Sequence, residues 1–270
     1  MPADMAPPSR HPGTQVPVHS ATRPLVITID GPAGVGKSTA AKLLAKQLGL
    51  MYLDTGATYR ALAYAALQRG IDLADRRRLA RLGRALPIRL KALASGGVRV
   101  LLNGEEVTRP IRTERVTEAA AILAQYPSVR QAMVRLQRRL AQAQGVVAEG
   151  RDTGSVVFPH AGYKFFLTAT TAIRAKRRQV ELRGVEGRAP SVTRIARTLR
   201  ERDHLDRTRR TGPLTKPAGC IVLDTSRLGI KDVVERLRRS LPHGSTLGDV
   251  SGCGAKRRSN LRYDPNSDCV

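Results

Sequence analysis

Short apolar runs alternate with longer segments of helical periodicity along the middle of this 270-residue chain. The short runs are rich in β-branched residues and predict buried parallel strands; they lie at 25–29, 51–53, 145–149, 163–167 and 220–223. The longer segments repeat apolar residues every three or four positions, as one face of a helix does; they lie at 40–48, 55–69, 75–85, 114–125, 127–140, 171–183, 191–204 and 230–240. This alternation predicts an α/β fold with a five-stranded parallel sheet and helices on both faces.

One stretch breaks the alternation. Residues 88–93, residues 98–102 and the positions around Val107 are strand-like, and Ser95-Gly96-Gly97 and Asn103-Gly104 separate them. Asn-Gly is a strong signal for a tight hairpin turn. We therefore expect a small antiparallel β insert, spanning about 83–112, inside the α/β domain.

The two ends of the chain lack apolar periodicity. Residues 1–24 contain six prolines, and residues 243–270 are rich in Gly, Ser and Asn. We interpret the first segment as a disordered leader and the second as a disordered tail, which leaves 25–242 as the folded domain. No apolar run has the length of a membrane span, and no CxxC pair occurs among the three cysteines. These features suit a cytoplasmic protein without a membrane partner.

The composition is strongly basic, with 47 Lys+Arg against 22 Asp+Glu and a formal net charge of +25. Two interpretations compete: a surface for polyanions, or an Arg-rich background around a phosphate site. The arginines are dispersed, and aromatic residues make up only 3% of the chain, so few rings are available for base stacking. We favour the phosphate site and expect no specific nucleic acid.

A glycine-rich loop between the first strand and the first helix fits G-x-x-x-x-G-K-[ST]. Its backbone N–H groups and the start of the helix predict a cradle for the phosphates of ATP. Lys37 would reach the β- and γ-phosphates, and the Ser38 hydroxyl would ligate Mg²⁺. The predicted ATP-binding residues are Gly31, Pro32, Ala33, Gly34, Val35, Gly36, Lys37, Ser38 and Thr39.

Two further polar clusters follow predicted strands, where ligands of parallel sheets bind. Asp54 and Thr55 follow the second strand, and Arg60 lies one to two turns into the next helix. Glu149, Arg151 and Asp152 lie at the end of the third predicted strand, 145–149. A solvated Arg60 and a structural ion-pair cluster at 149–152 are the alternatives to a binding role.

A charged segment at 201–209 could form a mobile arm. Arg202, Asp206 and Arg209 are spaced to share one helix face, and glycines and prolines flank the segment. A charged, solvated helix is the alternative. We expect a mobile helical lid over about 184–213, with Gly184 among its hinges, which would close over the substrates and exclude water.

Taken in order, these motifs resemble the bacterial cytidylate kinases of the nucleoside monophosphate kinase group. The resemblance runs from about Leu25 to Leu241. It rests on ITIDGPAGVGKST (27–39), YLDTGATYRALA (52–63), IRTERV (111–116), YPSVRQAM (126–133), AEGRDTGSVVFPHA (148–161), RERDHLDRTR (200–209) and IVLDTS (221–226). The insert resembles the extended monophosphate-binding region of this family.

The resemblance implies an ATP:CMP/dCMP phosphotransferase that uses Mg²⁺, and we expect a monomer. The implied catalytic cations are Lys37, Arg60, Arg151, Arg202 and Arg209. The implied CMP site comprises Thr55, Arg60, Arg130, Glu149, Arg151, Asp152, Arg202, Asp206 and Arg209. Within it, Arg130 and Glu149 match positions that contact cytosine, and Asp152, Arg202 and Asp206 match positions near the sugar.

One departure leaves a base contact unassigned, because many family members have a serine where this chain has Ala121. Two other functions remain open from the residues alone. One is a basic nucleic-acid-binding protein with a regulatory phosphate loop; the other is a kinase for a different small acceptor.

Overall fold

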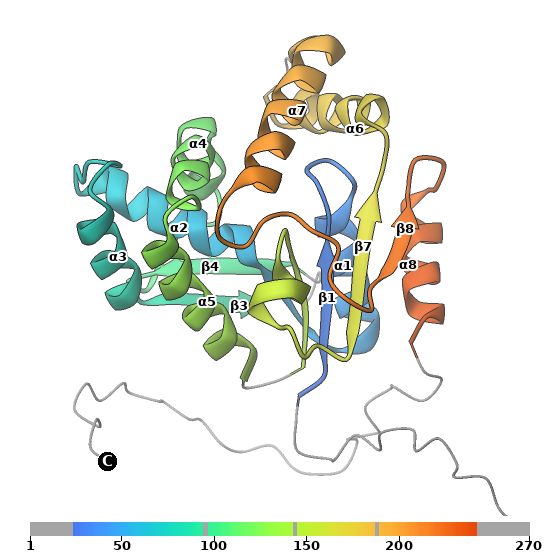
Figure 1. Ribbon diagram of the computed structural model, residues 1–270, viewed down its shortest axis with the longest axis horizontal. Coiled ribbons are helices and arrows are strands. Elements are labelled where there is room, and N and C mark those ends of the chain that lie inside the picture. Colours follow the sequence, from blue (N-terminus) through green and yellow to red (C-terminus); the bar gives the residue numbers. More distant parts are fainter. Residues whose placement is uncertain (1–23, 94–96, 143–144, 187–188, 242–270) are drawn as a thin grey trace, which may run out of the picture.

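A five-stranded parallel sheet forms the centre of the computed structural model, which describes residues 24–93, 97–142, 145–186 and 189–241 (Figure 1). Its strand order is β2-β6-β1-β7-β8. The strands are β1 (Val26–Asp30), β2 (Met51–Asp54), β6 (Val146–Gly150), β7 (Tyr163–Thr168) and β8 (Ile221–Asp224). Every neighbouring pair is parallel, so the predicted sheet is confirmed. The predicted leader and tail lie outside the described residues.

Strand alternation sends side chains to two apolar layers, one on each face of the sheet. On one face, Ile29, Tyr52 and Val147 pack with helices α1 (Lys37–Leu48) and α8 (Ile230–Arg239). On the other face, Leu53 and Ala148 pack with α5 (Pro127–Gln142). Helices therefore cover both faces, as the alternation of segments predicts.

A second layer of helices joins the small insert. Helices α2 (Thr55–Gln68), α3 (Arg76–Ala85), α4 (Glu114–Leu123) and α5 share one core with the three-stranded antiparallel sheet β3-β4-β5. The strands are β3 (Ile88–Ala92), β4 (Val98–Leu102) and β5 (Glu105–Glu106), and a 3₁₀ turn (Pro110–Arg112) follows. The turn before β5 has Asn103 and Gly104 at positive φ, as the predicted hairpin requires.

Helices α6 (Thr171–Glu186) and α7 (Val192–Thr208) pack together beyond the carboxyl end of the sheet, at the top of Figure 1. Helix α6 runs through Gly184 to Glu186, past its predicted end at 183, while the hinge role of Gly184 stays a prediction. One glycine costs a helix only about 1 kcal/mol, and its neighbours are mostly good helix formers. None of the helices in the described ranges is long and apolar enough to cross a membrane.

Candidate active site

The phosphate loop joins β1 to α1, which confirms the strand, loop and helix order expected for it. Gly31, Gly34 and Gly36 all have positive φ, at 146°, 78° and 94°. A side chain on Gly31 would also collide with the carbonyl oxygen of Leu167 in the adjacent strand β7. The motif glycines are therefore required by backbone conformation and by close packing.

Lys37, at the start of α1, carries a buried amine that has no ion-pair partner among the described residues. Only 5% of the residue is exposed, and its Nζ donates to the backbone oxygen of Pro32 at 2.7 Å. Within the described part of the chain it forms no ion pair. Burial, and then the nearby positive charge of Arg151, lower the pKa of Lys37 to about 7. An anion bound in the loop would stabilise the charged form.

The Ser38 hydroxyl donates to Oε1 of Glu149 at 2.6 Å, and the Tyr52 hydroxyl donates to the same oxygen at 3.1 Å. The two groups next to the loop are thus a hydroxyl and a carboxylate. Oxygen ligands of this kind suit Mg²⁺, which usually takes one or two protein groups and completes its shell with phosphates and water. The residues present therefore fit the expected metal.

Asp54 and Arg60 form an ion pair of 2.7 Å at the start of α2. Asp54 also caps this helix, because its Oδ1 accepts from the N–H of Ala57 at 2.9 Å. Burial acts to raise the pKa of Asp54, but Arg60 and then Arg112 outweigh it and hold the pKa below its usual range. The Thr55 hydroxyl donates to the backbone oxygen of Glu149 at 2.7 Å, so it fixes the end of β6.

One ion pair joins the charged segment at 201–209 to Arg151, and a second lies within the segment. Arg151 Nε lies 2.8 Å from Asp206 Oδ2, and Arg209 Nη1 lies 3.3 Å from Asp206 Oδ1. Although burial opposes it, these arginines lower the pKa of Asp206. Arg202 has no ion-pair partner among the described residues, and burial together with Arg151 lowers its pKa to about 10.

The expected base-reading pair is not brought together. Arg130 forms its ion pair with Asp152, and Arg209 Nη2 lies 3.6 Å from the other oxygen of that carboxylate. Gly212, at φ 59°, packs directly against Arg130 and Asp152 and accepts from Arg209 Nε at 2.5 Å. Glu149 lies instead with Ser38, since it projects from the sheet face that α1 covers.

Sequence reasoning missed the residues that attach the phosphate loop to α6. Arg174 Nη1 donates to the backbone oxygen of Ala33 at 3.1 Å, and Arg177 Nη1 donates to that of Val35 at 3.3 Å. Arg174 also pairs with Asp203 of α7 at 2.7 Å. The spacing of three between the two arginines is the sole sequence signal, and it is shared by many solvated helices.

Sequence comparison with known proteins points to one family. The family model described as "Cytidylate kinase" matches residues 27–242. A cytidylate kinase from Pelotomaculum thermopropionicum is 46% identical over 211 residues, covering 78% of this chain and 93% of that protein. A cytidylate kinase from Caldanaerobacter subterraneus subsp. tengcongensis is 42% identical over 224 residues, covering 83% and 97%. Among solved structures, a shikimate kinase from Bacteroides thetaiotaomicron is 14% identical with a TM-score of 0.39, covering 80% of this chain and 97% of that one.

Proposed function

The chain belongs to the cytidylate kinase family, and we propose how its side chains divide the work of phosphorylating CMP and dCMP with ATP. The reaction moves the γ-phosphoryl group of ATP to the acceptor and yields ADP with CDP or dCDP. The acceptor phosphate is already ionised, so the site needs positioning and positive charge and no general base.

One observation carries the proposal: the site holds several cationic side chains that repel one another. Burial lowers the pKa of Lys37, and the positive charges of Arg151 and Arg202 lower it further. Burial likewise lowers the pKa of Arg202, and the positive charges of Arg151 and Arg60 add to the effect. Lys37 and Arg202 lack carboxylate partners in the described ranges. Phosphoryl groups between these four side chains would relieve the repulsion, most of all when negative charge spreads over the moving group.

At the ATP end, the loop N–H groups and Lys37 bind the β- and γ-phosphates. Ser38 and Glu149 are the residues that would hold Mg²⁺, which neutralises phosphate charge when bound. This assignment moves Glu149 from the cytosine to the metal side, and its support is the 2.6 Å hydrogen bond from Ser38.

At the acceptor end, Arg60, Arg151, Arg202 and Arg209 would hold the monophosphate. The Asp152 carboxylate would accept from the cytosine amino group, and Arg130 would donate to the ring acceptors. Two buried nitrogens support a polar ligand here, because Nε of Arg130 and Nη2 of Arg209 have no hydrogen-bond partner in the described part of the chain. Asp206, between Arg151 and Arg209, would accept from a sugar hydroxyl.

A coupled assay of ADP release against CMP, dCMP, UMP, AMP and GMP tests the proposal. We expect turnover with CMP and dCMP, weaker turnover with UMP, and none above background with AMP or GMP. Turnover of AMP or GMP at the CMP rate would contradict the acceptor assignment. We also propose that the protein is cytoplasmic and that it is a monomer. Sedimentation of the full chain would test the monomeric state.

A further inference from the structure

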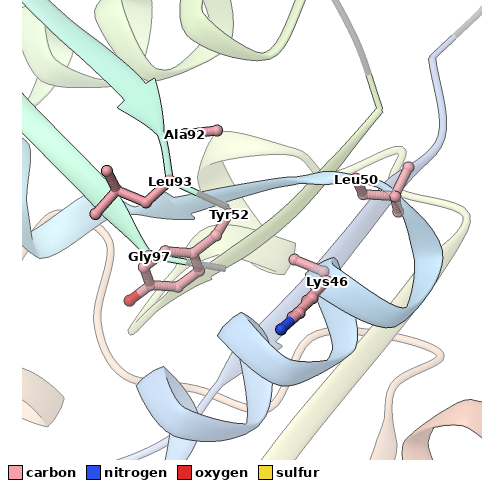
Figure 2. Close-up of a pocket in the computed structure, with 8 residues that line it drawn as sticks. Lys46, Leu50, Tyr52, Ala92, Leu93 and Gly97 are labelled. Atoms are coloured by element: carbon pink, nitrogen blue, oxygen red, sulfur yellow. The ribbon is translucent and has the colours of Figure 1, made fainter. Parts of the chain in front are cut away.

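Tyr52 connects the active site to a cavity behind it. Its ring lines a cavity of about 100 Å³ between the end of α1 and the β3–β4 hairpin, together with Lys46, Leu93 and Gly97 (Figure 2). Its hydroxyl donates to Glu149 Oε1 at 3.1 Å. The residue is 3% exposed and belongs to the same apolar layer as α1.

Sheet register explains why this hydroxyl reaches the site. Tyr52 lies directly opposite Val147, so Glu149 is two residues further along β6 and on the same face. Ser38 lies in the first turn of α1, the helix that covers this face. Strand β2, strand β6 and helix α1 therefore each supply one member of a group centred on Glu149 Oε1.

The Tyr52 ring is buried and lies next to a lysine side chain. Lys42 Nζ lies 5.5 Å from the ring centroid, at the distance of a cation–π contact.

We propose that Tyr52 is a positioning residue for metal-bound ATP: its hydroxyl holds the Glu149 carboxylate in the orientation that faces Ser38. This inference rests on the proposed placement of Glu149 and Ser38 at the metal. Glu149 is 5% exposed and can turn about its side-chain bonds, so a second donor on Oε1 selects one orientation. Without it, the carboxylate must be ordered by the metal itself, and part of the binding free energy is lost.

A purely structural Tyr52 predicts a different outcome. If the hydroxyl only hydrogen-bonds a buried carboxylate, its removal lowers the stability of the fold and weakens ATP binding equally with and without metal. If it positions Glu149 for the metal, its removal weakens only the metal-dependent part of ATP binding.

The test measures ATP binding by calorimetry without any acceptor, once with Mg²⁺ and once with EDTA, for wild type and Tyr52→Phe. We expect the variant to lose about tenfold in affinity for ATP with Mg²⁺, as for a deleted hydrogen bond to a charged group, and less than twofold with EDTA. Tyr126→Phe is the matched control, because its hydroxyl donates to the Leu73 carbonyl at 3.0 Å in the insert layer. It should leave both affinities unchanged.

A Glu149→Gln variant shows whether a failure lies in the metal assignment or in the positioning role of Tyr52. If Glu149→Gln keeps the full gain from Mg²⁺, the metal assignment fails and the role of Tyr52 fails with it. If Glu149→Gln loses the gain but Tyr52→Phe keeps it, only the positioning role is wrong. Equal losses with Mg²⁺ and EDTA in Tyr52→Phe would also overturn it. Thermal melting by circular dichroism sets an assay temperature at which every variant is folded.

Discussion

Arg174 Nη1 lies 2.7 Å from Asp203 Oδ2, and only 4% of each side chain is exposed. The two residues belong to α6 and α7, and Arg174 also holds the Ala33 carbonyl of the phosphate loop. Ala33 also belongs to one buried apolar cluster with Ile195 and Leu199 of α7. The arm that carries Arg202 and Asp206 is thus tied to the ATP loop by a buried ion pair and an apolar contact.

The first prediction concerns this ion pair. Asp203→Ala leaves the Arg174 guanidinium buried and uncompensated, so we expect the free energy of unfolding to fall by about 3–5 kcal/mol. Urea unfolding measures the change. Glu201→Ala is the control on the same helix, because its pair with Arg197 is exposed on both sides and should contribute about 0.5 kcal/mol or less. Equal effects of the two substitutions would contradict the role of the buried pair.

The second prediction concerns the motion of the arm. The expected lid spans 184–213. Within it, Asp203 pairs with Arg174 of α6, and Asp206 pairs with Arg151. Hydrogen exchange over 192–208 should slow when a bisubstrate analogue binds, because closure adds contacts to Arg202 and Arg209. Unchanged exchange, together with an Arg209→Ala variant of nearly full activity, would mean that α7 is an ordinary surface helix.

The third prediction concerns Lys37. Lys37→Ala removes an oriented charge from the phosphates that gain negative charge during transfer, which commonly supplies about 3–4 kcal/mol. We expect kcat to fall by about a thousandfold in the coupled ADP assay. A variant within tenfold of wild type would refute the assignment of the phosphate loop.

The fourth prediction is a proton uptake on ATP binding. The pKa of Lys37 is about 7 in the free protein, against 10.5 ordinarily, so at pH 8 the amine is mostly neutral. Phosphates favour the charged form and raise this pKa, so ATP binding at pH 8 should take up roughly one proton. Calorimetry in two buffers of different ionisation enthalpy measures the uptake.

Lys37→Arg is the control for this uptake, since a guanidinium stays charged throughout. The same uptake in Lys37→Arg would assign the proton to another group. The sign also fixes a stability trend: the unfolded chain binds more protons between pH 7 and pH 10.5, so the contribution of Lys37 to stability rises with pH in that window.

Much of the fold and of the phosphate site follows from local signals in the sequence. The strand, glycine loop and helix around Lys37 are predicted by a motif with a physical reason for each position. Asp54 is recognisable as a helix cap, and the turn at Asn103 and Gly104 as a hairpin. Each of these features depends on residues that are close in sequence.

The partners of the charged side chains could not be predicted in the same way. Glu149 and Asp152 are three residues apart, yet the first projects from β6 toward α1 and the second, past the end of the strand, meets Arg130. Which face α1 covers is set by the packing of the whole sheet. Likewise, nothing in the sequence separates the buried Arg174 from the partly exposed Arg177 and Arg178 on the same helix.

The last prediction is about base choice, and it separates Asp152 from Glu149. Cytosine offers an amino donor where uracil has an oxygen, so a carboxylate facing that position would be left unpaired by UMP. A site built around such a hydrogen bond can discriminate by up to about 10⁴-fold in kcat/KM. Because Ala121 supplies no hydroxyl to the base, we expect about 10²-fold in favour of CMP.

An amide at position 152 can turn either its nitrogen or its oxygen toward the base. Asp152→Asn should therefore shrink the ratio of kcat/KM for CMP over UMP to below about tenfold. Glu149→Gln, on the metal side, should lower both kcat/KM values together and leave their ratio near the wild-type value. The ratio is the informative quantity, because a general loss of activity from the broken Arg130 pair cancels in it. If Glu149→Gln collapses the ratio and Asp152→Asn preserves it, the carboxylate that reads cytosine is Glu149, and the base and metal assignments must be exchanged.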